Sequence, residues 1–288
     1  MNLGLDFAFL RNRINGTIDV YSKESTDLLY SRDLPLVSGG GSVYDNVGKV
    51  QNRGIEIALN TINVQTKDWN WTTSFNFARN INKVKTINGE DKIISSSNPI
   101  TQSLFVGSSV NNIYLYNWTG VVTDRMITVP NNQASVDNGF TAGEKVRSCD
   151  YYHKVYGWSE GMPIVEDVDG NGVIDADDKK VLGSQDPSWT GNISSTLSWK
   201  NWDFSFSIYT KQNFTVYSNT LADTYDFNYR GWNKINMDYY IPAGTLINCD
   251  GVNENGTYIN PVYQEQTHYG SLPMPNASIS NNGMGEPY

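Results

Sequence analysis

The sequence predicts an all-β fold, an antiparallel sheet of the transmembrane β-barrel type, on three observations. Apolar and polar residues alternate strictly in several segments, and no long segment shows a helical period. Short turns join these segments in pairs, whereas long polar segments connect one pair to the next. Tryptophans stand near the ends of the apolar faces, as in the aromatic girdle of an outer-membrane barrel.

Three hairpins account for the alternating segments, at about residues 2–23, 54–79 and 190–212. Their turns are centred on residues 11–13, 66–68 and 200–201. One side of each strand is apolar and the other carries Ser, Thr, Asn, Asp and Lys. The apolar side includes Leu3, Leu5, Phe7, Phe9, Ile14, Ile18, Val20, Ile55, Ile57, Leu59, Trp69, Trp71, Phe75, Phe77, Ile193, Leu197, Trp199, Trp202, Phe204, Phe206 and Ile208.

The remaining segments, at about residues 24–53, 80–189 and 213–288, are rich in Gly, Asn, Ser, Asp and Tyr. Short turns at one end and long connections at the other are typical of an outer-membrane barrel, whose long loops are extracellular. We therefore treat residues 1–288 as one partial barrel domain. A soluble sandwich with one wet face is the alternative, but a connection as long as 80–189 is unusual in a compact domain.

Composition excludes several function classes. The 288-residue chain has a net charge of -9, which argues against nucleic acid as a partner. His153 and His268 are the only histidines, neither is near a nucleophile pair, and no phosphate-binding motif is present, so we expect no enzyme. Cys149 and Cys249 are the only cysteines; they are either two free thiols or a disulfide formed in an oxidising compartment.

The segment DVDGNGVIDADD, residues 167–178, carries five Asp and no basic residue. Its oxygen-bearing positions match an EF-hand-type calcium loop. The expected ligands are the side chains of Asp167, Asp169, Asn171 and Asp178, the carbonyl of Val173, and Asp175 through a water. Hard oxygen ligands favour Ca²⁺ over zinc or copper. No flanking helices are evident, so we expect a structural calcium ion that rigidifies a long loop; the alternative is a solvated acidic turn.

Three segments together resemble the C-terminal part of SusC/RagA-type TonB-dependent outer-membrane transporters of Bacteroidetes. They are DNVGKVQNRGIEIALN (45–60), FVGSSVNNIYLYNWTG (105–120), and the run from Pro163 through the acidic loop to Gly191, followed by the hairpin 192–210. The resemblance implies a barrel of about 22 strands with an N-terminal plug. Neither the plug nor a TonB-contacting segment is found here, so the chain is interpreted as a fragment.

The resemblance also implies a function: import of an oligosaccharide or peptide, energised by TonB, with a SusD-like surface lipoprotein over the pore and outer-membrane lipid around the wall. Loop aromatics are candidates for substrate contact, although packing within the loops is the simpler role for each. They are Tyr114, Tyr116, Trp118, Tyr151, Tyr152 and Trp158. The competing hypothesis is a secreted, calcium-stabilised adhesin or carbohydrate-binding module.

Overall fold

The computed structural model describes residues 1–26, 29–33, 37, 39–46, 48–87, 89–95, 98–218 and 238–274. The chain forms two compact units. The first unit comprises Met1–Leu115 and Val181–Tyr217, and the second comprises Tyr116–Lys180 and Ser218–Tyr288. Within the described ranges, no helix has the length and hydropathy needed to cross a membrane.

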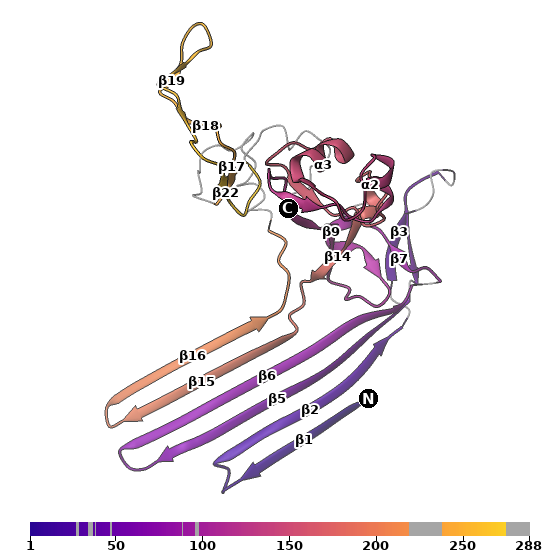
Figure 1. The fold of residues 1–288 in the computed structure, drawn as a ribbon. Helices are drawn as coiled ribbons and strands as arrows, with labels where there is room; N and C mark the ends of the chain where they lie inside the picture. Colours follow the sequence, from indigo (N-terminus) through magenta and orange to yellow (C-terminus); the bar gives the residue numbers. More distant parts are fainter. Residues whose placement is uncertain are drawn as a thin grey trace. The chain divides into compact units, whose positions relative to one another are not determined.

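A six-stranded antiparallel sheet dominates the first unit (Figure 1). Its order is β1-β2-β5-β6-β15-β16, and the three hairpin turns lie together at one end of the sheet. The strands are β1 (Asn2–Phe9), β2 (Ile14–Ser25), β5 (Lys49–Gln65), β6 (Trp69–Thr86), β15 (Trp189–Trp199) and β16 (Trp202–Gln212). All three predicted hairpins are present, with turns at 10–13, 66–68 and 200–201.

The register aligns the apolar residues of all six strands on one face. Ile18 pairs with Leu5 and Ile57, Phe75 with Leu59 and Ile193, and Phe204 with Leu197. A shift of one residue anywhere would move a strand's apolar residues to the other face. We call this surface the apolar face and the opposite surface the polar face.

The apolar face is exposed in this structure. Leu3, Phe204 and Trp202 are 67%, 64% and 74% exposed. Four tryptophans gather at the turn end of this face, where Trp69 pairs with Trp199 and Trp199 with Trp202, while Trp71 lies on the same face of β6. The rings of Trp69 and Trp199 stack at 5.4 Å between centroids. The tryptophans predicted near the strand ends therefore gather at the turn end of the sheet, where an aromatic girdle was expected.

The central strands extend further than the apolar alternation predicts. The hairpin expected at 54–79 runs from Lys49 to Thr86, so the loops expected at 24–53 and 80–189 are shorter. The added residues pair with one another, as Asn52 does with Asn82. Because polar residues dominate this end of both strands, hydrophobic periodicity does not reveal it.

The segments predicted as loops contain their own secondary structure. Two-stranded sheets form from β3 with β4, β7 with β8, β9 with β14, β10 with β13 and β11 with β12. The elements are β3 (Leu29–Asp33), β4 (Ser42–Asn46), β7 (Lys92–Ile93), α1 (Pro99–Gln102), β8 (Leu104–Phe105), β9 (Asn112–Tyr116), β10 (Trp118–Val121), β11 (Met126–Thr128), α2 (Gln133–Asp137), β12 (Lys145–Arg147), α3 (Ser148–Tyr156), β13 (Pro163–Val165), the 3-10 helix η2 (Ala176–Asp178) and β14 (Lys179–Ser184). Residues 238–274 add β17–β22, described below.

Each unit has its own small core. In the first unit, Val50, Val84 and Ile87 pack together beneath Ile93, Leu104 and Val110. In the second unit, Val122, Trp158, Met162 and Val165 form the core, with Tyr152 and Tyr156 packed against it. The long connection between β6 and β15 is therefore a folded part of the molecule.

Gly48 immediately precedes β5 and has a conformation that only glycine adopts readily. Its φ is +139°, and an added Cβ would lie 1.9 Å from the carbonyl oxygen of Thr86. Gly48→Ala should therefore destabilise the pairing of β5 with β6 by more than about 1 kcal/mol. Gly89→Ala is the matched control, because Gly89 has a φ of +86° but open space around its Cβ position. Urea unfolding of the two full-length variants checks this, and equal losses would contradict the clash.

Candidate functional site

The acidic loop lies between β13 and β14 in the second unit and ends in η2. It brings three of the predicted ligands together: carboxylate oxygens of Asp167, Asp169 and Asp178 lie within 4.8 Å of one another. Gly172 has a φ of +86°, which supplies the tight turn expected at the sixth loop position. The predicted spacing therefore produces a convergent group of oxygens.

Backbone amides hold the first ligand, Asp167, in place. Its Oδ1 accepts a hydrogen bond from the amide of Gly170 at 2.6 Å, and its Oδ2 accepts one from Gly172 at 2.8 Å. The Tyr156 hydroxyl also donates to Oδ2, at 2.9 Å. Burial and this contact raise the pKa of the Tyr156 phenol, which keeps it a hydrogen-bond donor. Asp167 is thereby tied to the end of α3.

Of the three carboxylates, that of Asp178 is the most buried, and a nearby cation would stabilise its negative charge the most. Asp178 is 1% exposed, and its two oxygens accept hydrogen bonds from the amides of Val168 at 2.7 Å and Asp175 at 2.8 Å. Among the described residues, neither Asp178, Asp167 nor Asp169 forms an ion pair. Buried carboxylates are normally paired or bound to metal. The donor set, with three carboxylates close together, fits a hard divalent cation such as Ca²⁺.

The other three predicted ligands are placed less directly. The Oδ1 atom of Asn171 accepts from the amide of Val173 at 2.7 Å, and its amide nitrogen donates to Asp169. Asp175 is outside the three-carboxylate group, and its Oδ1 accepts from the amide of Asp177 at 2.8 Å as the cap of η2. Its expected role through a water therefore competes with a structural role at the helix.

An ion pair ties the two ends of the acidic loop. Glu166 precedes the loop and Lys180 follows it, and their Oε2 and Nζ atoms lie 2.6 Å apart. Asn117 also donates to this carboxylate. The contact with Lys180, followed by the contact with Asn117, lowers the pKa of Glu166 below its ordinary value. The loop ends are thus held together by contacts outside the candidate metal ligands.

The loop aromatics expected to contact substrate are mostly packed inside the structure. Tyr114, Tyr151 and Trp158 are 6%, 1% and 6% exposed. The rings of Tyr156 and Trp158 stack at 4.6 Å between centroids, and Tyr152 stacks on both. Tyr116, Trp118 and Tyr152 are partly exposed. For the three buried residues the packing role is the one observed.

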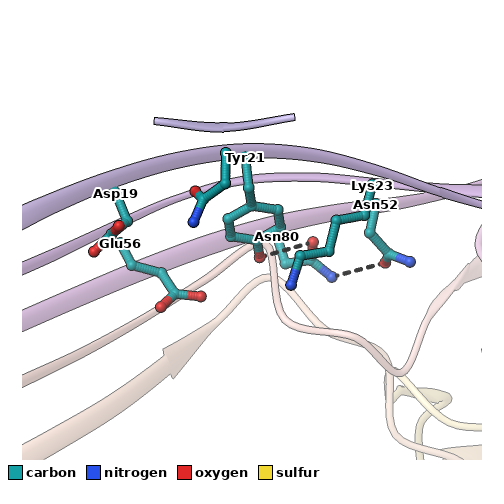
Figure 2. A pocket seen from close by; sticks show the side chains of 7 residues that line it. Asp19, Tyr21, Lys23, Asn52, Glu56 and Asn80 are labelled. Atoms are coloured by element: carbon teal, nitrogen blue, oxygen red, sulfur yellow. Dashed lines mark hydrogen bonds between the residues drawn. The ribbon is translucent and has the colours of Figure 1, made fainter. Parts of the chain in front are cut away.

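The polar face of the sheet contains an open recess of about 470 Å³ that sequence reasoning did not identify (Figure 2). It is lined by Asn2, Asp19, Tyr21, Lys23, Asn52, Glu56 and Asn80. The ring of Tyr21 lies over Gly54, where an added Cβ would be 2.4 Å from the ring. The Tyr21 hydroxyl donates to Asn80, and Asn80 donates to Asn52 (Figure 2).

This chain of hydrogen bonds continues to the segments that follow β6. Asn82 donates to Asn52 at 2.9 Å and accepts from the amide of Val110. Asp186 in turn accepts from Ser109 at 2.6 Å and from Asn111 at 2.8 Å. The polar network therefore joins residues from all three segments that carried the family resemblance. In the sequence, the asparagines at alternate positions 80 and 82 were the pattern that could have predicted this network.

The chain matches the family described as "TonB dependent receptor-like, beta-barrel" over residues 1–209. It belongs to this family. The all-β fold class and the resemblance to TonB-dependent receptors are thereby confirmed. The family consists of receptors and not of enzymes, in agreement with the expectation from the sequence. Membership also assigns the six-stranded sheet to a barrel wall.

Curated relatives extend the comparison. TonB-dependent receptor P3 of Formosa agariphila is 33% identical over 209 residues, covering 70% of this chain and 19% of that protein. TonB-dependent receptor SusC of Bacteroides thetaiotaomicron is 27% identical over 312 residues, covering 97% of this chain and 28% of that protein. The chain thus spans between 19% and 28% of the length of these TonB-dependent receptors.

Solved structures of a related transporter agree in fold. The RagAB peptide importer in its closed-closed state aligns with a TM-score of 0.51 and 25% identity, over 73% of this chain and 21% of that chain. Another structure, titled as the RagAB peptide transporter, gives a TM-score of 0.52 at 23% identity over 72% of this chain and 20% of that chain. The similarity to SusC and to the RagAB structures confirms the resemblance of this TonB-dependent receptor segment to SusC/RagA-type receptors.

The two cysteines do not form a disulfide in this structure. Cys149 and Cys249 both belong to the second unit, and both are free thiols, partly buried. Burial and the neighbouring Asp150 carboxylate raise the pKa of the Cys149 thiol. Because the thiolate is the reactive form, this environment disfavours disulfide exchange at Cys149. Of the two alternatives left open by the sequence, the structure has the free thiols.

Proposed function

We propose that this chain forms part of the wall and loops of an outer-membrane nutrient importer. The observation that carries this proposal is the six-stranded sheet with one exposed apolar face and one polar face. Lipid contact on one side and a wet lumen on the other require this division. The aromatic girdle at the turn end suits a membrane interface, with short turns on the periplasmic side and long connections outside the cell.

The importer takes up an oligosaccharide or a peptide through a lumen whose wall includes the recess around Tyr21 and Asn80. Membership of the TonB-dependent receptor family supports energisation by TonB. The similarity to SusC and to the RagAB peptide importer supports a SusD-like surface lipoprotein as partner. Nutrient uptake, energisation by TonB and pairing with the lipoprotein are proposed for the full-length protein, of which this chain is a minor part.

The acidic loop 167–178 binds Ca²⁺ as a structural ion in this proposal. Asp167, Asp169 and Asp178 supply carboxylate oxygens, Asn171 a side-chain oxygen and Val173 its carbonyl, while Asp175 contributes through a water. When bound, the ion neutralises a buried negative charge at Asp178. Asp167 then links the ion to Tyr156, and so to the aromatic core of the second unit.

The competing hypothesis is a secreted, calcium-stabilised adhesin or carbohydrate-binding module. A soluble sandwich would bury one face of its sheet against a second layer. Here the apolar side chains of both edge strands are exposed: Leu5 on β1 and Ile208 on β16 are each 59% exposed. The importer explains this exposure and the module does not.

Cell fractionation and growth test the proposed function. Cells carrying the full-length protein should retain it in the outer-membrane fraction, and only detergent should release it. Deletion of the gene should abolish growth on some member of a panel of oligosaccharides and peptides, and the intact gene should restore it. Release of the protein into the medium as a soluble monomer would overturn the importer and favour the secreted module.

A further inference from the structure

An extended hairpin, residues 240–269, extends away from the core of the second unit; we call it the arm (Figure 1). It consists of three successive antiparallel pairs. These are β17 (Tyr240–Ile241) with β22 (His268–Tyr269), β18 (Leu246–Asn248) with β21 (Val262–Tyr263), and β19 (Gly251–Val252) with β20 (Tyr258–Ile259). The turn is fixed by Asn253, whose amide donates to the carbonyl of Thr257 at 2.9 Å.

The base of the arm is firmly anchored. Tyr240 is fully buried, and its hydroxyl donates to Glu160. The Tyr269 hydroxyl donates to Asp124 at 2.7 Å, and the guanidinium of Arg125 lies 3.8 Å from the centre of the Tyr269 ring. These contacts all join the arm to residues 116–180 of the same unit. The arm is therefore held in a defined place at its base.

The tip of the arm, residues 246–263, exposes apolar side chains from both strands. Six of them are between 43% and 56% exposed: Ile247, Val252, Tyr258, Ile259, Val262 and Tyr263. Val252 pairs with Tyr258, and Gly251 with Ile259, so neighbouring pairs place apolar groups on both faces of the hairpin. A two-stranded hairpin alone is only marginally stable in water, and such an exposed patch is typical of an interaction site.

The charge of the arm distinguishes among the surfaces that could cover its exposed tip: a lipid membrane, a second copy of this chain, or another protein. Residues 238–274 contain Asp238, Asp250, Glu254 and Glu265 and no Lys or Arg. An anionic lipid surface would repel this arm, and so would the same arm of a second copy. A protein surface with an apolar patch bordered by Lys and Arg would be attracted to it and would cover its aliphatic side chains.

We propose that the tip of the arm docks into an apolar patch, bordered by Lys and Arg, on a folded protein partner. This rests on the proposed pairing with a surface lipoprotein, which supplies the probe for the test. Val252 and Ile259 insert from opposite faces of the tip, and Glu254 at the turn meets the basic border. The anchored base limits the conformational entropy lost on binding.

The test measures binding of the purified SusD-like lipoprotein to the full-length transporter in detergent. Val252→Thr, Ile259→Thr and Val262→Thr combined should weaken binding by about tenfold or more, since a few buried apolar residues dominate such interfaces. Threonine keeps the β-branched shape, so the hairpin is retained. Asn255→Ser with Thr257→Ser is the matched control on the same tip and should bind as the wild type does.

Glu254→Lys isolates the charge. It should weaken binding severalfold at low salt and reduce the salt dependence that the wild type shows. Equal binding by the wild type and the threonine variant would overturn the proposed docking role of the arm while leaving the lipoprotein pairing intact. Failure of the wild type to bind would overturn both. Loss of vesicle binding or of self-association in the threonine variant, with lipoprotein binding unchanged, would assign the tip to lipid or to a second copy and also overturn the proposal.

Discussion

Arginine in place of Phe206 should destabilise the full-length protein in a bilayer by about 2 to 4 kcal/mol. Phe206 lies at the middle of β16 on the apolar face, opposite Ser195, and is 43% exposed. If this face contacts lipid, the guanidinium would have to enter the hydrocarbon region or deform the bilayer around it. The measurement is urea unfolding of the protein refolded into phospholipid vesicles.

Ser205→Arg is the matched control. Ser205 is the preceding residue on the same strand, is exposed, and points to the polar face. The same charge there would remain in a wet lumen and should change the stability by less than about 0.5 kcal/mol. If the two variants lose the same stability, or if Ser205→Arg loses more, the assignment of lipid and lumen sides is wrong.

The sequence alone was sufficient to predict the hairpins and their faces. Alternation in 2–9, 14–20 and 69–77 predicted the register because one face of a two-sided sheet must be uniformly apolar. The turns at 66–68 and 200–201 followed from the polar residues between alternating runs. The prediction failed where periodicity ended. Residues 49–53 and 80–86 pair through backbone hydrogen bonds although most of their side chains are polar; Val50 and Val84 are the buried exceptions.

The secondary structure of the connections between hairpins could not be predicted from the alternation of apolar and polar residues. Their strands are two to six residues long, which is too short for a hydrophobic period to emerge. The core of the second unit brings Val122 together with Trp158 and Val165, contacts that local sequence does not encode. Hence aromatics such as Tyr151 and Trp158, predicted as possible substrate contacts, are buried.

The convergence of the acidic side chains was predictable because their spacing is local, whereas their binding of a metal ion stays a prediction. Asp167, Asp169 and Asp178 converge as the twelve-residue pattern requires. The recess on the polar face was not predictable, because Asp19, Glu56 and Asn80 come from three strands and meet only through register. The arm was also missed: its strands are short, and its segment was expected to be an extracellular loop.

Calcium should protect residues 116–180 of the full-length protein from protease, and Asp169→Asn should remove most of that protection. Calcium at a hundred times its dissociation constant would stabilise the loop by about 2.7 kcal/mol. Asparagine at 169 keeps an oxygen that can accept from the amide of Asn171, now 3.0 Å away, but removes one ligand charge. The measurement is the rate of cleavage in calcium and in chelator.

Asp177→Asn is the control that gives this experiment its meaning. Asp177 belongs to the same loop and is exposed, yet it lies outside the three-carboxylate group. Both substitutions remove one negative charge, so general electrostatics predicts the same effect for both. A bound ion predicts that only Asp169→Asn needs at least about tenfold more calcium, because metal affinity depends on ligand charge.

Asp178→Asn separates ion binding from loop folding. The buried carboxylate of Asp178 accepts two backbone hydrogen bonds, and an asparagine amide can accept only on one side. This variant should therefore cleave faster than the wild type even in chelator, whereas Asp169→Asn should match the wild type there. If calcium protects the wild type, Asp169→Asn and Asp177→Asn equally, the acidic loop is a solvated turn, and the contacts of Asp178 alone explain its burial.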